Sequence, residues 1–279
     1  MSDARADAEI SESIFIADGE RFLPTAHARG PWDPRALHGG APAALITTAF
    51  ERLQPGGELP IARLSFELLR PVPMAPLTLA TRIVRPGRRV QELAAELRAG
   101  EQTIARAAAL RVQAVPAEAA RAAVPAGELS APLPPVADAE PLHFSLDGSS
   151  QASFAVSAME MRAFGQTRAF GQTRALGRAR VWMRLRHPLL PGEPLTPLAR
   201  LAATADFANG VSAALPFDRF LFINADLAVH LLRPPCGEWI GLDARTRLPA
   251  DGIGTAESVL HDERGALGRA FQTLVVQPR

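Results

Sequence analysis

Cysteine is almost absent from this chain. Of its 279 residues, only Cys236 carries a thiol. One cysteine excludes a disulfide framework within the chain and a zinc cluster built from cysteines, because both need several thiols. A chain that uses cysteine so little is typical of a reducing compartment, and we expect it to work in the cytoplasm.

The chain also lacks an excess of either charge. Lysine plus arginine total 30 and aspartate plus glutamate total 29, so the formal net charge is +1. No block of basic residues alternates with aromatics, and no apolar run is long enough to span a bilayer. The N-terminal stretch MSDARADAEISES has no basic start and no apolar core, so no secretory signal is expected. Neither nucleic acid nor a membrane is an expected partner.

Apolar residues are plentiful. They make up 47% of the sequence against 21% charged residues, the balance of a globular protein with a sizeable core. The length allows one large domain or two of ordinary size. An internal repeat would decide between these two organisations.

Such a repeat is present. Leu-Leu-Arg-Pro occurs at residues 68–71 and again at 231–234, and residues 61–112 align with 224–275 without a gap. The identities exceed what a composition rich in Ala, Leu and Arg gives by chance. The identical pairs are Ala62/Ala225, Leu64/Leu227, Leu68/Leu231, Leu69/Leu232, Arg70/Arg233, Pro71/Pro234, Leu79/Leu242, Arg82/Arg245, Pro86/Pro249, Ala107/Ala270 and Val112/Val275.

Each copy of the motif ends an alternating apolar run. In the first copy Leu64, Phe66 and Leu68 alternate with more polar residues, as a half-buried strand requires, and residues 223–231 behave alike. The Arg-Pro pair ends each strand, because proline cannot donate to a sheet. Short turns then predict antiparallel meanders. The further strands are expected at 77–83, 90–98 and 103–113, and at 239–246, 254–261 and 267–277.

A helix is expected before each meander, at 38–53 and at 198–215, with short strands before them at 21–24 and 180–186. Matching the Ala-Ala-Leu sequences at 43–45 and 213–215 sets Asp206 opposite Ala36. Between the halves, residues 114–143 are rich in Ala and Pro and predict a linker without a core of its own. The domains are therefore 1–113 and 144–279. A tandem copy at 162–177 predicts an expanded hairpin or loop.

These motifs, in this order, resemble the thioesterase II-like branch of the double hotdog acyl-CoA thioesterases. The resemblance implies an α+β fold of two tandem repeats, each with a long central helix wrapped by an antiparallel β-sheet. It also implies a cytoplasmic enzyme of fatty acid metabolism that hydrolyses a fatty or related acyl-CoA to free acid and coenzyme A. Coenzyme A is part of the substrate, so neither a cofactor nor a metal is expected. Such proteins are homodimers or larger homo-oligomers. The residues that carry the resemblance are His38-Gly39-Gly40, the two Leu-Leu-Arg-Pro turns, Ala205-Asp206-Phe207, Asn224-Ala225-Asp226 and Phe271-Gln272.

The resemblance also implies a hydrolytic site. In the family, an aspartate on the second helix, a hydroxyl residue at the start of the strand before the Arg-Pro turn and a glutamine in the last strand act together. The matching positions hold Asp206, Asn224 and Gln272, so the chain departs from the pattern at Asn224. Asp206 would accept a proton from water, Asn224 would hold that water, and Gln272 would donate to the thioester oxygen or fix the water. Ile61 and Ala109 occupy the corresponding strand positions of the first copy, which predicts one site per chain.

Substrate-binding residues are expected beside this trio. The amides of Gly39 and Gly40, next to His38 at the start of the first helix, could stabilise an oxyanion. Arg88, in the basic turn 85–89, could meet the phosphates of coenzyme A.

Other functions stay open. A non-catalytic acyl-CoA or acyl-chain binding protein fits the amide at Asn224. A hotdog hydratase or dehydratase would need an acid–base histidine, and His38, the only one next to a predicted helix, has no acid near it in the sequence. His38-Gly39-Gly40 is similar to a lipase oxyanion loop, but the chain has no Gly-x-Ser-x-Gly nucleophile motif. The His261-Asp262-Glu263 run is expected to be a solvated turn.

Overall fold

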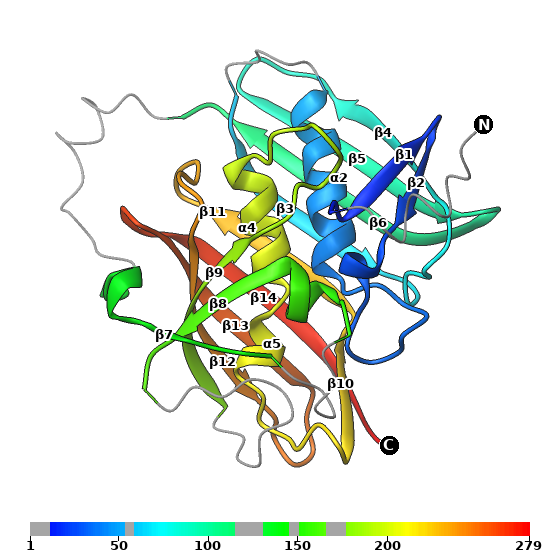
Figure 1. The fold of residues 1–279 in the computed structure, drawn as a ribbon. Helices are drawn as coiled ribbons and strands as arrows, with labels where there is room; N and C mark the ends of the chain where they lie inside the picture. Colours follow the sequence, from blue (N-terminus) through cyan, green and yellow to red (C-terminus); the bar gives the residue numbers. More distant parts are fainter. Residues whose placement is uncertain (1–11, 54–58, 115–130, 145–150, 166–176) are drawn as a thin grey trace, which may run out of the picture.

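Antiparallel strands are the dominant regular structure (Figure 1). The computed structural model describes residues 12–53, 59–114, 131–144, 151–165 and 177–279. One sheet has the order β1-β2-β4-β5-β6-β3-β11-β14-β13-β12-β9-β8-β7, and β10 also pairs with β14. The strands are β1 (Phe15–Asp18), β2 (Arg21–Pro24), β3 (Ile61–Leu68), β4 (Leu77–Arg85), β5 (Val90–Ala99), β6 (Gln102–Val112), β7 (Glu140–Pro141), β8 (Met159–Ala163), β9 (Arg178–Leu185), β10 (Phe220–Asn224), β11 (Asp226–Leu231), β12 (Ile240–Arg247), β13 (Gly254–Asp262) and β14 (Gly265–Pro278).

The two expected meanders are confirmed. β4, β5 and β6 follow one another as antiparallel neighbours, and so do β12, β13 and β14. The strand expected at 223–231 is divided at Ala225 into β10 and β11. β8, which pairs with β9, was not predicted from the sequence.

The two strands that end in Leu-Leu-Arg-Pro lie side by side. β3 pairs with β11 in antiparallel register, with Leu64 opposite Val229. Each of these strands also pairs with the last strand of its own meander, β3 with β6 and β11 with β14. This junction joins both halves into one sheet.

The helices α2 (Gly40–Arg52) and α4 (Pro197–Ala205) lie beside each other on the same side of the sheet (Figure 1). They approach closely, since a Cβ atom on Gly40 would lie 2.4 Å from the Ala203 carbonyl oxygen.

The prediction of a single helix at 198–215 is wrong, because the helix breaks at Asp206 before the short α5 (Ala208–Val211). The alignment on Ala-Ala-Leu is also wrong, because residues 213–215 lie beyond α5. None of the described helices has the length and apolar character that crossing a membrane requires.

One hydrophobic core runs through both halves and contains residues of α2, α4 and the two meanders. A small second cluster holds Leu133 and Ala139 against Trp182, whose indole N–H donates to the Pro134 carbonyl. The described part of the Ala/Pro-rich segment therefore packs on the sheet through these residues. Residues 115–130 of that segment, and 166–176 of the tandem copy, lie outside the described residues. Short 3-10 turns at Ala26–Ala28 and Val136–Asp138, and a π-turn at Phe154–Ala158, complete the structure.

Candidate active site

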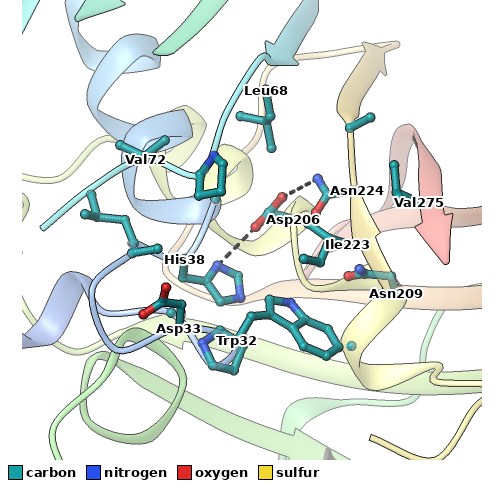
Figure 2. Close-up of a pocket in the computed structure, with 18 of the residues that line it drawn as sticks. Trp32, Asp33, His38, Leu68, Val72, Asp206, Asn209, Ile223, Asn224 and Val275 are labelled. Carbon is teal, nitrogen blue, oxygen red and sulfur yellow. Dashed lines mark hydrogen bonds and ion pairs between the residues drawn. The ribbon is translucent and has the colours of Figure 1, made fainter. Parts of the chain in front are cut away.

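A cavity of about 340 Å³ lies where the two halves meet (Figure 2). The loop before α2, the residues after β3, the break between α4 and α5, and the junction of β10 and β11 form its walls. Most of the lining residues are apolar, and several of the polar groups gather around Asp206. The cavity thus has the general form of a small-molecule site, with an apolar wall and a few convergent polar groups.

Asp206 is the centre of these polar groups. It ends α4 and is only 4% exposed. Its Oδ1 accepts a hydrogen bond from Asn224 Nδ2 at 2.9 Å, and its Oδ2 lies 3.0 Å from His38 Nδ1 (Figure 2). A buried carboxylate needs partners of this kind, because water no longer solvates it.

Gln272 binds backbone groups that the helix break at Asp206 leaves free. Its Nε2 donates to the Asp206 carbonyl oxygen and its Oε1 accepts from the Asn209 N–H, each at 3.1 Å. A continuous helix would satisfy both backbone groups internally. Gln272 is 2% exposed and is not among the residues that line the cavity. The structure therefore places it beside Asp206, with both ends of its amide bound to backbone.

Asn224 does line the cavity. It is the last residue of β10, and its Nδ2 also donates to the Asp226 carbonyl oxygen at 3.2 Å. No described residue donates to its Oδ1. This oxygen can accept a hydrogen bond from a water next to the Asp206 carboxylate.

His38 faces Asp206 from the other half of the chain. Its ring stacks on Phe207 with centroids 4.2 Å apart, and on Phe154 at 5.1 Å, which fixes the ring plane. The same Nδ1 that faces Asp206 is also the acceptor nearest the Gly40 N–H, at 3.1 Å. One nitrogen cannot both donate to the carboxylate and accept from the amide. At any one time Nδ1 therefore serves one of these two partners, and the ring lies between the Asp206 carboxylate and the start of α2.

The two glycines make this arrangement possible. A Cβ atom on Gly39 would lie 2.8 Å from Asp206 Oδ2, so only glycine leaves room for the carboxylate at the start of α2. The N-terminus of a helix also favours negative charge. Gly39 lines the cavity and no described residue accepts its N–H, whereas Gly40 does not line the cavity and its N–H points at His38.

Arg88 is not part of this arrangement. It is exposed in the turn between β4 and β5 and does not line the cavity. The structure therefore brings Asp206, Asn224, His38 and Gly39 together, with Gln272 behind them, and leaves Arg88 apart.

The expectation of a solvated turn at 261–263 is wrong for its first two residues. His261 is 0% exposed, and neither ring nitrogen has a hydrogen-bond partner among the described residues. Burial lowers the pKa of His261. Asp262 is buried as well, and its carboxylate binds the Arg233 guanidinium. Burial alone would raise the pKa of this carboxyl, but the hydrogen bonds that it accepts, first among them those from Arg233, hold the pKa below its usual range. These residues belong to the sheet, because β13 extends through Asp262.

A second cavity, of about 290 Å³, lies at the corresponding place of the first half. Ile61 lines it at the position that matches Asn224. It also contains Glu51, whose Oε2 accepts a hydrogen bond from Thr196 Oγ1 at 2.6 Å. Burial raises the pKa of Glu51. The described part of the chain contains no cluster of three or more His, Cys, Asp and Glu side chains suited to a metal.

Two family models match the sequence. That of the acyl-CoA thioesterase N-terminal domain covers residues 28–112, and that of the acyl-CoA thioesterase C-terminal domain covers residues 131–276. Among curated proteins, none is significantly similar in sequence.

Solved structures share the fold over nearly the whole chain. A conserved protein of unknown function with a hot dog fold from Alicyclobacillus acidocaldarius is 18% identical, with a TM-score of 0.70 and coverage of 100% of this chain and 99% of that one. A candidate thioesterase II from Thermobifida fusca YX is also 18% identical, with a TM-score of 0.69 and coverage of 100% and 98%. The acyl-CoA thioesterase II TesB2 from Mycobacterium marinum is 16% identical, with a TM-score of 0.63 and coverage of 94% and 92%. The chain therefore has a hotdog fold of the α+β class.

Proposed function

Because the chain belongs to the acyl-CoA thioesterase family and is a thioester hydrolase, we propose that Asp206 directs the hydrolysis of a fatty or related acyl-CoA in the first cavity. The observation that carries this proposal is the Asp206 carboxylate itself, which is buried, bound by Asn224 and His38, and open to an apolar cavity. The apolar wall suits an acyl chain, and the polar end suits the thioester.

The chemistry follows from these contacts. A water beside Asn224 Oδ1 attacks the thioester carbonyl carbon while an Asp206 oxygen accepts its proton. The free Gly39 N–H, at the start of α2, donates to the oxygen of the tetrahedral intermediate. The intermediate then collapses, the carbon–sulfur bond breaks, and the proton passes to the departing sulfur. The products are a free acid and coenzyme A.

Gln272 has a different part in this proposal from the one expected from the sequence. Its amide donates to the Asp206 carbonyl oxygen and accepts from the Asn209 N–H, which lie on the two sides of the helix break. It holds the helix break in shape and so fixes where the carboxylate points. It is a positioning residue and does not contact the substrate.

The larger organisation is also part of the proposal. α2 packs in the first half and α4 in the second, each beside an antiparallel meander, and the meanders have equivalent strand order around the β3–β11 junction. This supports a double hotdog of two tandem repeats, 1–113 and 144–279, connected by 114–143. Exposed apolar residues on β14, such as Phe271 and Val275, support a homodimer or larger homo-oligomer. The protein would act in the cytoplasm, with no cofactor beyond the coenzyme A of its substrate.

The test is thiol release from acyl-CoAs of several chain lengths by the purified protein, compared with Asp206→Asn. That change keeps the size of the side chain and removes the proton acceptor, so kcat should fall by about 100-fold or more. Asp33→Asn is the matched control, because Asp33 lines the same cavity but its side chain is 39% exposed and paired with Arg35. Thiol release that does not depend on Asp206 would overturn the mechanism.

The His38–Asp206 pair favours a second candidate, the hydratase or dehydratase, because the acid that the sequence did not place near His38 is 3.0 Å away. Water addition to a 2-enoyl-CoA, without release of thiol, would support this candidate. Tight acyl-CoA binding without either reaction would support the non-catalytic binding protein.

A further inference from the structure

The two Leu-Leu-Arg-Pro turns are held in the same way by the sheet. The Leu69 N–H donates to the Ile104 carbonyl at 3.1 Å, and the Leu232 N–H donates to the Leu267 carbonyl at 2.9 Å. Arg70 and Arg233 follow these leucines and therefore occupy equivalent positions. The side chains of the two arginines nevertheless have different surroundings.

Arg233 is bound within the protein. Its guanidinium donates to both carboxylate oxygens of Asp262, at 2.5 and 2.6 Å, and to the Gly265 carbonyl. The position equivalent to Asp262 in the first half is occupied by Ala99. The strand pairing shows this equivalence, because Ala99 pairs with Gln102 across one turn and Asp262 pairs with Gly265 across the other. The first half thus has no carboxylate for Arg70.

Arg70 is exposed and lines the active-site cavity, and its guanidinium has no partner among the described residues. An exposed side chain that lines a cavity lies where the cavity opens. The chain contains no lysine, so every side chain with a permanent positive charge is an arginine. Arg70 is the one arginine among the residues that line this cavity, and it is therefore the one permanent positive charge there. The negative charge of Asp33, on the same cavity, is already balanced by Arg35.

We propose that Arg70 binds a phosphate group of coenzyme A at the mouth of the cavity. The planar guanidinium matches the oxygens of a phosphate and donates two parallel hydrogen bonds to them. This inference rests on the proposed function, because it assumes that the acyl group lies inside the cavity and the rest of the thioester leaves through its mouth. Under this proposal, the arginine of the second copy, Arg233, stabilises the structure, and the arginine of the first copy, Arg70, binds the substrate.

Calorimetric titration of the whole protein with coenzyme A, 4′-phosphopantetheine and pantetheine tests the proposal. Arg70→Gln should weaken coenzyme A binding about tenfold, the effect of losing a hydrogen-bonded charge. It should leave pantetheine binding unchanged, and Arg70→Lys should recover part of the loss. Arg88→Gln removes the same charge away from the cavity and should change nothing.

The three ligands also identify the phosphate. Equal losses with coenzyme A and 4′-phosphopantetheine assign Arg70 to the phosphate that both share, and a loss with coenzyme A alone assigns it to the nucleotide part. Equal affinity of Arg70→Gln and unmodified protein for coenzyme A would overturn the proposal, as would the absence of coenzyme A binding to the unmodified protein. Thiol release is measured separately. If coenzyme A binding depends on Arg70 but no thioester is hydrolysed, only the proposed function is overturned. If thioesters are hydrolysed but coenzyme A binding does not depend on Arg70, only this inference is overturned.

Discussion

His38 and Asp206 come from opposite halves of the chain, and their side chains meet with Nδ1 and Oδ2 3.0 Å apart. His38 precedes α2 and Asp206 ends α4, so the contact depends on how closely the two helices pack. Glycine at positions 39 and 40 allows that packing. The site is therefore a product of the junction between the halves, and neither half contains it alone.

Gly39→Ala should reduce activity with little effect on stability. The new Cβ would lie 2.8 Å from Asp206 Oδ2 and would push the carboxylate aside. A displacement of this size in an active site lowers kcat by about 10–100-fold. Steady-state kinetics measures the first effect and thermal unfolding the second. Unchanged kcat would mean that the carboxylate position is not critical.

Gly40→Ala should reduce stability and, because the site depends on the packing of α2 against α4, activity as well. Here the new Cβ would lie 2.4 Å from the backbone oxygen of Ala203, which cannot move without separating α2 from α4. Overpacking of this kind costs about 1–3 kcal/mol of unfolding free energy. Denaturant titration measures the loss. A stability equal to that of the unmodified protein would show that the helices separate without penalty.

Asn224 can be tested with a matched pair of variants. Asn224→Thr restores a hydroxyl at the position where the family has one, and Asn224→Val has the same shape without it. The threonine can still donate to Asp206 Oδ1, so its kcat should stay within about tenfold of the unmodified enzyme, and valine should lose on the order of 100-fold. Equal rates for the two variants would remove position 224 from the mechanism.

The strands were predictable from the sequence because their signals are local. Alternation in β3 and β11 followed by Arg-Pro marks both the strand and its end, and the structure ends them at Leu68 and Leu231. The position of Asp206 near Asn224 was expected only from the family resemblance, and the geometry is consistent with it.

The helix break and the His38–Asp206 pair were not predictable, because their causes are not local. Asn209 and Gly210 are poor helix formers, but they do not fix the break at Asp206, and the backbone groups that it frees are bound by Gln272 in a distant strand. The pair depends on the crossing of two helices. The one signal that pointed to it was the His-Gly-Gly sequence, since consecutive glycines at a helix start permit close approach.

Gln272→Leu should destabilise the fold and reduce activity together. Leucine would leave the Asp206 carbonyl and the Asn209 N–H buried without partners, which costs about 3 kcal/mol or more. A glutamine that only held the catalytic water would give a different result, namely a loss of kcat at unchanged melting temperature. Thermal unfolding and kinetics on the same preparation separate the two roles.

His261 should make stability depend on pH. Burial lowers its pKa in the folded protein, while in the unfolded chain it titrates at its ordinary value near 6.5. Below that value the unfolded chain binds a proton that the folded protein does not. The free energy of unfolding should therefore fall as the pH drops from about 6.5, by up to about 1.4 kcal/mol per pH unit for this proton. His27 contributes in the same direction, because burial and the nearby His187 lower its pKa as well.

His261→Leu isolates the contribution of His261. Both ring nitrogens are buried without partners, so leucine removes two unsatisfied polar atoms and no hydrogen bond. The variant should be at least as stable as the unmodified protein at pH 7.5, and its stability should fall less steeply between pH 6.5 and 5. Urea titrations across this range measure both effects. An unchanged slope would show that His261 gains its proton equally in the folded and the unfolded chain.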